Sequence, residues 1–440
     1  MKNPRSNFPG KDGNLLFVAL APFLLLVHSA CTGCQPSAPP HPEVGTVTQA
    51  NSDGYNYKKD GNRRTDFIYN QLWYFNFLDE TQDIAGVAAY GLANPENLLA
   101  QRGLTNSFGM IIREETDTEK SFPVYSEQWD PSVPGNFHAS ETFEPAEGFE
   151  FQNPGGTIDV TEIAPGIHKY AVKGESVSRD QLGQVTRAIY WDLQYTRGPG
   201  PGWRPWVEWP VPHTLSIFPA WISYHMNMPN AYVDGTFRVL DNTVSPPSDV
   251  TYTLSNAKGY HDGFYSKFVF SIFEWDWLDY KQYGVPGKSE EISVHLLHPH
   301  APRYACKGGW ETCTPGNLRV YYGGKEYNFY RGKREEENQI FVTYAPPDEW
   351  FEDPQAHGVR CPLYATIEAR DRDGTLRLHL TWQKKRHIVV YYDVPAPFED
   401  TVTYELVSDF DGYFLNDSGG KVYIQGPGWS DYSGPAFPGT

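Results

Sequence analysis

The chain has 440 residues and a formal net charge of −18, and aromatic residues make up 15% of it, with 13 Trp and 29 Tyr. An acidic chain is repelled by phosphate backbones and by anionic lipid surfaces, so this composition argues against a protein that binds nucleic acid. The length exceeds what one hydrophobic core of ordinary size supports and therefore predicts two domains.

The N-terminus has the pattern of an export signal. It begins with three basic residues, Lys2, Arg5 and Lys11, and an apolar run over residues 15–27 follows. The run is too short to span a bilayer comfortably as a helix, so residues 1–34 are predicted to be a signal peptide, with an uncleaved anchor as the alternative. We therefore expect an exported protein, located in the periplasm or the extracellular space.

Two cysteines, Cys31 and Cys34, come directly after the apolar run, and residues 35–55 form a Pro-rich tether. This arrangement resembles a bacterial lipoprotein signal, in which the cysteine after the cleavage site carries lipid. Both cysteines are therefore candidates for lipidation, which would tether the protein to a membrane. Plain secretion is the alternative.

Two segments are expected to divide the remainder of the chain. Residues 197–212 contain three Trp among Gly and Pro with almost no strand pattern, and are predicted to be an aromatic flap or an interdomain connector. A second boundary is expected in residues 242–249, which contain two consecutive prolines. The resulting domains cover residues 56–245 and 250–440.

Short strands joined by tight turns are predicted in both domains. The dipeptides at 234–235 (Asp-Gly), 323–324 (Gly-Gly) and 373–374 (Asp-Gly) each separate two strand-like runs, as hairpin turns do. Residues 376–382 alternate Leu or Trp with polar residues, which is the pattern of a half-buried strand. Many short strands with few helix signals predict an all-β protein built of sandwiches or barrels.

Three cysteines lie in the body of the chain. In an oxidising compartment, Cys306 and Cys313 are near enough in sequence to close a short disulfide loop, which would leave Cys361 over. The sequence does not decide between this pairing and one that uses Cys361.

Common catalytic signatures are missing from the sequence. It has no P-loop, no GxGxxG dinucleotide turn, no GxSxG elbow and no HExxH, which disfavours nucleotide, NAD, elbow-hydrolase and zinc-protease chemistry. His295, His298 and His300 have no spacing typical of a metal site, and a proline stands between the last two. We therefore expect a solvated loop there and no metal.

The most informative stretch is residues 259–265, which read Gly-Tyr-His-Asp-Gly-Phe-Tyr. Because side chains alternate along a strand, Tyr260 and Asp262 are expected on one face, and His261 and Tyr265 on the other. In residues 273–277, which follow, the same alternation places the two tryptophans on one face and the two carboxylates on the other.

A carboxyl group walled by aromatic rings loses solvation, so its pKa rises and it can act as a general acid near neutral pH. Aromatic faces also stabilise a nearby cation. Together these features suit the protonation of an alkene, followed by attack of water or by ring closure. The simpler interpretation is a hydrogen-bonded Asp–His pair that fixes a strand corner without any chemistry.

The sequence resembles the hydroxyneurosporene synthase (carotenoid hydratase) family, whose relatives include fungal kievitone hydratase-like proteins and decalin-forming Diels–Alderases. Five segments carry the resemblance: residues 72–75 (Leu-Trp-Tyr-Phe), 228–235 (Met-Pro-Asn-Ala-Tyr-Val-Asp-Gly), 259–262 (Gly-Tyr-His-Asp), 275–277 (Trp-Asp-Trp) and 426–432 (Gly-Pro-Gly-Trp-Ser-Asp-Tyr). The chain departs from the family pattern at Leu72, where relatives have Trp, and at residues 263–266, which follow the Gly-Tyr-His-Asp block.

The resemblance implies two tandem lipocalin-like antiparallel β-barrels with an apolar cavity near their junction. It also implies cofactor-free hydration or cyclisation of an isoprenoid or polyene. Carried over position by position, His261 and Asp262 match the family's polar active-site pair, while Trp275, Asp276 and Trp277 match its pocket strand.

The sequence thus predicts an exported, cofactor-independent hydratase or cyclase that acts as a monomer on a hydrophobic small molecule. Asp262 is the predicted general acid, helped by His261. Asp276 is predicted to orient the water or to hold a hydrogen bond that supports the residues of the site. The predicted ligand-binding residues are Trp73, Tyr74, Tyr260, Tyr265, Trp275 and Trp277. Two alternatives stay open: a lipocalin-like carrier of lipid or pigment, and a surface protein that binds carbohydrate through its Trp-rich segment.

Overall fold

The structure is a computed structural model. It describes residues 54, 55, 57, 69–97, 102–113, 121–140, 148–165, 167–200, 202, 204–210, 221–267, 274–284, 290–300, 316–330, 338–392 and 401–435. The predicted signal peptide, the lipidation candidates Cys31 and Cys34, and the predicted disulfide between Cys306 and Cys313 all lie outside these residues. Cys361 lies inside them as a buried free thiol.

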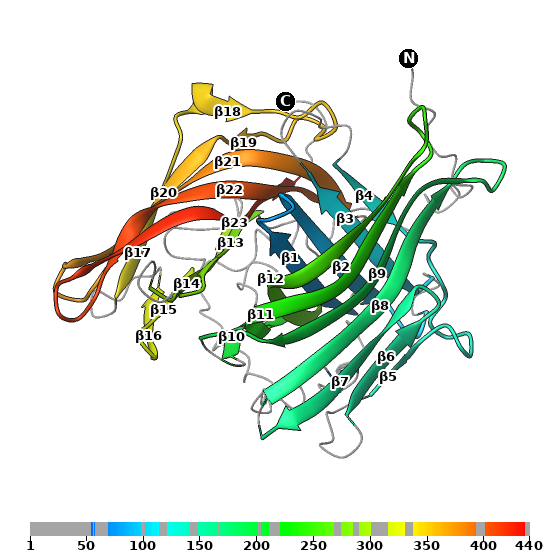
Figure 1. Cartoon of the computed structure of the whole chain (residues 1–440), viewed down its shortest axis with the longest axis horizontal. Helices are drawn as coiled ribbons and strands as arrows, with labels where there is room; N and C mark the ends of the chain where they lie inside the picture. The colour runs from blue at the N-terminus through cyan, green and yellow to red at the C-terminus, as the bar shows by residue number, and fades with distance from the viewer. Residues whose placement is uncertain are drawn as a thin grey trace, which may run out of the picture. The chain divides into compact units, whose positions relative to one another are not determined.

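The N-terminal part of the chain forms one large sheet (Figure 1). Its strands are β1 (Tyr69–Asp79), β2 (Ile84–Ala93), β3 (Leu104–Ile112), β4 (Phe122–Tyr125), β5 (His138–Ala139), β6 (Phe149–Asn153), β7 (Gly156–Ala164), β8 (Ile167–Arg179), β9 (Val185–Arg197), β10 (Arg204–Pro210), β11 (Trp221–Asp241) and β12 (Ser248–Lys267). Within the described residues it is 12-stranded, with the order β4-β3-β2-β1-β12-β11-β9-β8-β7-β6-β5, and β10 pairs with β11.

Two sequence-based expectations for this sheet are wrong. Residues 204–210, expected in a flap or connector, form β10 and pair with β11. The Asp-Gly pair at 234–235 makes no hairpin but lies inside β11, where the pairing register with β12 shifts between Val233 and Gly235. Gly235 has a φ of 130°, and a Cβ there would lie 2.1 Å from the Asp192 carbonyl oxygen. The glycine therefore marks a β-bulge rather than a turn.

The last strand of the N-terminal sheet ends at Lys267, and the first strand of the C-terminal part begins at Glu274. The sequence suggested an earlier boundary, near residues 245–250. β12 begins at Ser248 but pairs with β1 and β11, so it belongs to the N-terminal sheet. The proline-containing segment before it is the connection between β11 and β12.

The C-terminal part forms a closed barrel of β13-β14-β15-β16-β17-β20-β21-β22-β23, as far as its described residues show (Figure 1). Its strands are β13 (Glu274–Gln282), β14 (Ile292–His300), β15 (Asn317–Tyr322), β16 (Lys325–Tyr330), β17 (Gln339–Tyr344), β20 (Tyr364–Arg370), β21 (Leu376–Tyr392), β22 (Thr401–Leu415) and β23 (Lys421–Pro435). A 3-10 helix, η8 (Pro347–Glu349), and the strand pair β18 (Trp350–Phe351) and β19 (Cys361–Pro362) complete it.

The all-β prediction is confirmed, with a curled sheet and a closed barrel in tandem. Both hairpins predicted in the C-terminal part are also confirmed. Gly323 and Gly324 (φ 61° and 76°) join β15 to β16, and Gly374 (φ 85°) precedes β21. Positive φ is accessible to glycine at little steric cost, which explains the residue at each turn. The part of the chain that the structure describes contains no helix long and apolar enough to cross a membrane.

Each β-structure has its own apolar core. One face of the N-terminal sheet carries a cluster of buried side chains that includes Trp73, Phe75 and Tyr195. The interior of the barrel is occupied by a second cluster, which includes Tyr280, Trp382 and Phe414. A third cluster takes residues from both, so the two structures share buried surface.

A hydrogen-bonded ion pair also joins the two structures. Arg386 on β21 is 5% exposed, and its guanidinium donates to Asp83 in the turn between β1 and β2. One Nη is 2.7 Å from the Asp83 carbonyl oxygen, and the other is 2.5 Å from its carboxylate.

We expect Arg386→Met to lower the free energy of unfolding by about 2 kcal/mol, because hydrogen bonds to charged groups contribute about that much when a partner is buried. Differential scanning calorimetry would measure the change in the unfolding transition. The control is Lys385→Met on the same strand, whose ammonium is 3.9 Å from Asp409 and 32% exposed. If both variants shifted the transition equally, the ion pair would not hold the two structures together.

Candidate functional site

The third cluster, called the junction cluster below, lies between the N-terminal sheet and the barrel. Its members come from β1, β2, β3, β11 and β12 on one side and from β13, β21, β22 and β23 on the other. Its buried apolar residues are Tyr74, Leu78, Ala85, Val87, Ala89, Met110, Ile112, Met226, Tyr260, Trp277, Ile388, Val390, Val407 and Trp429.

Strand alternation brings Asp262 into the junction cluster. Asp262 on β12 is the cross-strand partner of Tyr74 on β1, and His261 is the partner of Phe75. Cross-strand partners share a face of the sheet. Since Tyr74 belongs to the junction cluster and Phe75 to the core of the N-terminal sheet, Asp262 and His261 face opposite sides.

The Asp262 carboxyl group is almost fully buried, with 4% of the residue exposed. The Tyr224 hydroxyl donates a hydrogen bond to its Oδ2, and the Tyr260 hydroxyl also hydrogen-bonds to the carboxyl group. Burial raises the pKa of Asp262 to about 7, and the two tyrosine hydrogen bonds offset only part of that effect. A carboxyl group in this state holds a proton near neutral pH and can also give it up.

Two further carboxyl groups lie in the same region. Glu405 on β22 is 2% exposed and pairs across the sheet with Asp431 on β23. The Tyr74 hydroxyl donates to Glu405 Oε2 over 3.4 Å, and the Trp275 indole donates to Asp431 Oδ2 over 3.3 Å. Burial raises the pKa of both carboxyls above the usual range, so protonated forms are favoured. Repulsion adds to this effect, from Asp262 at Glu405 and from Glu405 at Asp431.

Aromatic rings wall the acidic group. The Trp277 ring packs edge-to-face on Tyr260, with centroids 5.2 Å apart, and on Tyr74 at 6.3 Å. Such rings desolvate an acid and present negative π faces to any cation formed beside it. The junction cluster therefore combines a titrating acid with groups that stabilise positive charge.

The structure does not bring His261 to Asp262. The His261 Nδ1 is 2.9 Å from the Tyr74 carbonyl oxygen, and its ring stacks on Phe75 with centroids 3.8 Å apart. Its Nε2 is 3.3 Å from the Asn227 side-chain nitrogen. These contacts fix β12 against β1 from the core of the N-terminal sheet.

The predicted ligand-binding residues divide between the same two faces. Tyr74, Tyr260 and Trp277 are members of the junction cluster, and Trp275 packs against it. Trp73 instead packs on Phe151 in the core of the N-terminal sheet, and Tyr265 stacks on His225. The first group is placed to contact a molecule beside Asp262, and the second is not.

Asp276 faces the interior of the barrel, opposite to Trp275 and Trp277. Its Oδ2 accepts hydrogen bonds from His298 Nδ1 over 3.0 Å and from the Tyr344 hydroxyl. Asp276 and His298 are 4% and 1% exposed. This pair is separated from Asp262 by the wall of the barrel.

The expectation of a solvated loop at the histidines is wrong, because they lie on β14. His295 is 1% exposed and faces the junction, where its Nδ1 is 3.0 Å from Asp279 Oδ1. Across the described residues, no group of three or more His, Cys, Asp or Glu side chains is placed to hold a metal ion.

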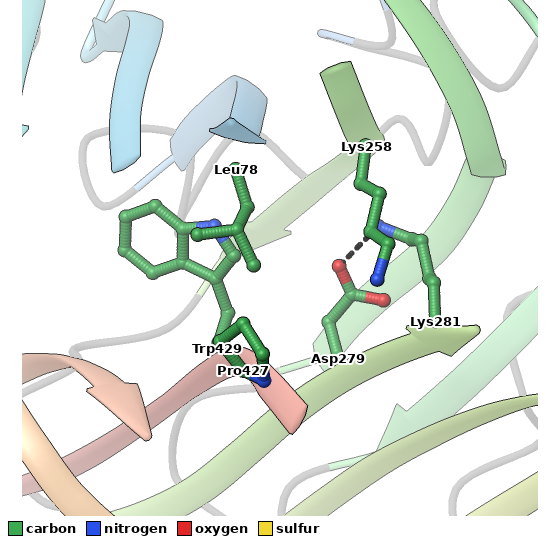
Figure 2. Close-up of a pocket in the computed structure, with 7 residues that line it drawn as sticks. Leu78, Lys258, Asp279, Lys281, Pro427 and Trp429 are labelled. Atoms are coloured by element: carbon green, nitrogen blue, oxygen red, sulfur yellow. Dashed lines mark hydrogen bonds and ion pairs between the residues drawn. The ribbon is translucent and has the colours of Figure 1, made fainter. Parts of the chain in front are cut away.

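A crevice opens beside the junction cluster, near the Asp279 carboxylate (Figure 2). Leu78 and Trp429 wall one side, and Lys258 and Lys281 lie on the other (Figure 2). Lys281 forms an ion pair with Asp279, shown as the dashed line. The crevice therefore joins the apolar cluster to charged groups.

Tyr224 and Glu405 belong to the acidic site but were not predicted from the sequence. Glu405 had a detectable signal, because it is a carboxylate inside an apolar strand, flanked by Tyr404 and Leu406. Tyr224 had none, since it lies after a Trp- and Pro-rich segment whose strand pattern is weak.

We expect Asp262→Asn to stabilise the folded protein at high pH. A carboxyl whose pKa rises from 3.8 to about 7 on folding destabilises the fold progressively as pH rises between those values, and fully above them. The thermal midpoint of the variant should exceed that of wild type by about 2 °C at about pH 8, with little difference near pH 4.

The control is Asp409→Asn, because the Asp409 side chain is 56% exposed. Its midpoint should follow wild type at both pH values. A difference between Asp262→Asn and wild type that did not depend on pH would contradict the raised pKa.

Comparison with known proteins found no matching family model and no matching curated protein. Solved structures do match. The crystal structure of CghA has a TM-score of 0.46 and 10% sequence identity, over 84% of this chain and 89% of that chain. Kievitone hydratase from Nectria haematococca has a TM-score of 0.46 and 10% identity, over 88% of this chain and 92% of that chain.

Proposed function

We propose that the junction cluster is the active site of a cofactor-independent acid catalyst, which hydrates or cyclises an isoprenoid or polyene. The observation that carries this proposal is Asp262, a carboxyl with a pKa of about 7 held between two tyrosine hydroxyls and packed near Trp277. General acids work best when their pKa is near the operating pH.

In the proposed reaction, protonated Asp262 gives its proton to one carbon of a double bond, and the other carbon becomes cationic. The π faces of Trp277 and Tyr74 stabilise that cation. Water then attacks it to give an alcohol, or a second double bond attacks it to close a ring. The intermediate finally loses a proton to the Asp262 carboxylate, which restores the acid.

Glu405 and Asp431 fit this chemistry as neutral acids. Their raised pKa values favour the protonated forms, which donate hydrogen bonds without presenting a full negative charge to the cation. In the hydration branch these carboxyl groups would hold the attacking water.

A hydrophobic substrate has an apolar approach to this site. Five apolar side chains pack against the junction cluster while keeping part of their surface exposed: Leu72, Phe108, Tyr224, Trp275 and Leu297. Leu72 and Trp275 each lie two residues before a buried aromatic residue of the cluster, on β1 and β13. We therefore place the substrate entrance at this end, called the apolar end below.

The carrier alternative receives less support. Buried apolar side chains occupy the barrel interior, where a lipocalin-like carrier would hold its ligand. A protein that only binds a hydrocarbon also has no need of a carboxyl group that titrates near neutral pH. Export from the cytoplasm, membrane tethering and a monomeric state stay predictions from the sequence.

The test of function is incubation of the purified protein with linear isoprenoids and polyenes, such as squalene and lycopene, in ¹⁸O-labelled water. Wild type should give a labelled alcohol or a cyclised isomer, detected by mass spectrometry. Asp262→Asn should lose about 100-fold or more of the rate. Asp409→Asn should retain it. Equal turnover by the Asp262 variant would refute the assignment, and unchanged binding without conversion would identify a carrier.

The pH dependence gives a separate prediction. Because the protonated form of Asp262 is the proton donor, the rate should be constant below pH 7 and fall as pH rises through about 7. Rates on the best substrate, measured across this range, should show one titrating acid. A rate that rises with pH would mean that the carboxylate acts instead as a base.

A further inference from the structure

The junction cluster has a charged end as well as an apolar one. Because β13 alternates its side chains, Trp277, Asp279 and Lys281 point to the same side of the strand. Lys281 is 4% exposed and Asp279 is 2% exposed, and their side chains form an ion pair. A buried ion pair is costly to desolvate and is weak evidence of a purely stabilising role.

This ion pair is part of a group of three titratable residues around Tyr260. His295 pairs with Asp279 across the sheet, and the atoms His295 Nδ1 and Asp279 Oδ1 are 3.0 Å apart. Lys281 Nζ lies 5.2 Å from the centre of the Tyr260 ring, and the His295 ring stacks on Tyr260 with centroids 6.0 Å apart. The Lys281 and His295 side chains therefore both lie against the Tyr260 ring.

Tyr260 connects this group of three to Asp262 through the Tyr224 hydroxyl. Its hydroxyl is 3.5 Å from the Tyr224 hydroxyl, which donates to Asp262 Oδ2. Tyr260 and Asp262 lie two residues apart on β12, so they share one face. The hydroxyl groups thus form a short row from the group of three to the carboxyl.

The opposite side of the group reaches the surface. Asp279 and Lys281 line the crevice, together with the partly exposed Lys258 (Figure 2). Lys258 precedes Tyr260 by two residues on β12. Along this strand the order is therefore crevice, tyrosine and acid.

We propose that Lys281, held by Asp279 and His295, is the solvent end of a proton route that reprotonates Asp262 through Tyr260 and Tyr224. The route rests on the proposed function for its purpose. Near neutral pH part of the resting protein holds Asp262 as a carboxylate, and that carboxylate must take up a proton before it can act as the acid. It leaves the apolar end free for the substrate.

The transfers balance along the row. The Lys281 ammonium, which lies over the Tyr260 ring, gives a proton to a water molecule that enters from the crevice, and this water passes one of its own protons to the Tyr260 hydroxyl. The Tyr260 hydroxyl proton passes to Tyr224, and the Tyr224 proton passes to the Asp262 carboxylate. Lys281 then takes a proton from solvent at the crevice. Each hydroxyl ends unchanged, and the net result is one proton from solvent bound to Asp262. Burial lowers the pKa of Lys281, which makes its ammonium a better donor, although the charge of Asp279 opposes this effect.

Other titratable groups face this row and define the competing routes. His261 and Asp279 act on Asp262 electrostatically, and Glu405 is itself influenced by Asp262. Lys281 faces the charges of Asp279 and Lys258, and His295 faces those of Lys281 and Arg319. Glu405, with Asp431 beside it, is the main alternative source of protons.

The test follows protonation of Asp262 without any substrate. After a rapid downward pH jump across pH 7, time-resolved infrared spectroscopy records the growth of the carboxylic acid C=O band that is absent in Asp262→Asn. Lys281→Met and Tyr260→Phe should slow this growth by about tenfold or more. Glu405→Gln should leave it unchanged. Circular dichroism would establish that each variant is folded.

Two variants separate proton transfer from other roles of Lys281. Lys281→Arg keeps the charge and the ion pair but cannot release a proton, so it should be as slow as Lys281→Met. Arg377→Met is the matched control, because Arg377 is also buried, is paired with Asp417 over 2.6 Å and lies over the Tyr327 ring at 5.3 Å. It should match wild type.

Wild-type speed in folded Lys281→Met or in Lys281→Arg would overturn the proposal, as would slowing in Glu405→Gln alone. Absence of the Asp262 band on both sides of pH 7 in wild type would overturn it too. Failure of the proposed function is distinguishable, because that result is fast protonation of Asp262 in a protein that converts no substrate.

Discussion

The site depends on burying one carboxyl group between two β-structures. Moving Asp262 out of water raises its pKa from 3.8 to about 7, and ionising the buried group becomes harder by about 1.4 kcal/mol for every tenfold weakening of the acid. The hydroxyls of Tyr224 and Tyr260 reduce that cost without neutralising the acid, because they donate hydrogen bonds but carry no charge. A lysine or arginine in their place would lower the pKa and remove the acid from its useful range.

A strand of the sheet and a strand of the barrel each run from one end of the junction cluster to the other. On β1 the order is Leu72, Tyr74 and Leu78, and on β13 it is Trp275, Trp277 and then the charged Asp279 and Lys281. Apolar surface with partial exposure thus lies at one end, the acid and aromatic rings in the middle, and the crevice at the other end. Because alternation fixes which side chains share a face, a few strand registers position the whole site.

Three aspartates that lie close together in the sequence, Asp262, Asp276 and Asp279, have different surroundings in the structure. Asp262 bonds to tyrosines, whereas Asp276 bonds to His298 inside the barrel, and Asp279 pairs with Lys281. Asp276 and Asp279 each have a partner that can carry positive charge, whereas the hydrogen-bond partners of Asp262 are phenol hydroxyls. Among them, the environment of Asp262 is the one suited to giving a proton to carbon.

Strand alternation could be predicted from the sequence, and the long-range pairing could not. The separation of Tyr260 and Asp262 from His261 follows from period two and is present in the structure. The meeting of Asp262 with Tyr224 depends on the register of β11 against β12, which shifts at three places, and such irregularities leave little trace in a single sequence. The approach of Glu405 to Tyr74 and Asp262 depends on contact between the sheet and the barrel, so no local sequence pattern predicts it.

The same reasoning explains the errors at β10 and β14. The Trp- and Pro-rich residues of β10 lack alternation, yet the strand forms because β11 offers a partner. The histidines of β14 were expected in a solvated loop because a proline stands among them, but His295 and His298 are each buried beside an aspartate, Asp279 or Asp276. Tertiary partners decided both cases.

The central claim, that Asp262 is a buried acid that titrates near neutral pH, is most directly tested by NMR of protein labelled with ¹³C at the aspartate side-chain carboxyl. The Asp262 resonance would be assigned by its loss in Asp262→Asn and followed as a function of pH. The account predicts a titration midpoint near 7. A midpoint near 4, the ordinary value for an exposed aspartate, would contradict it.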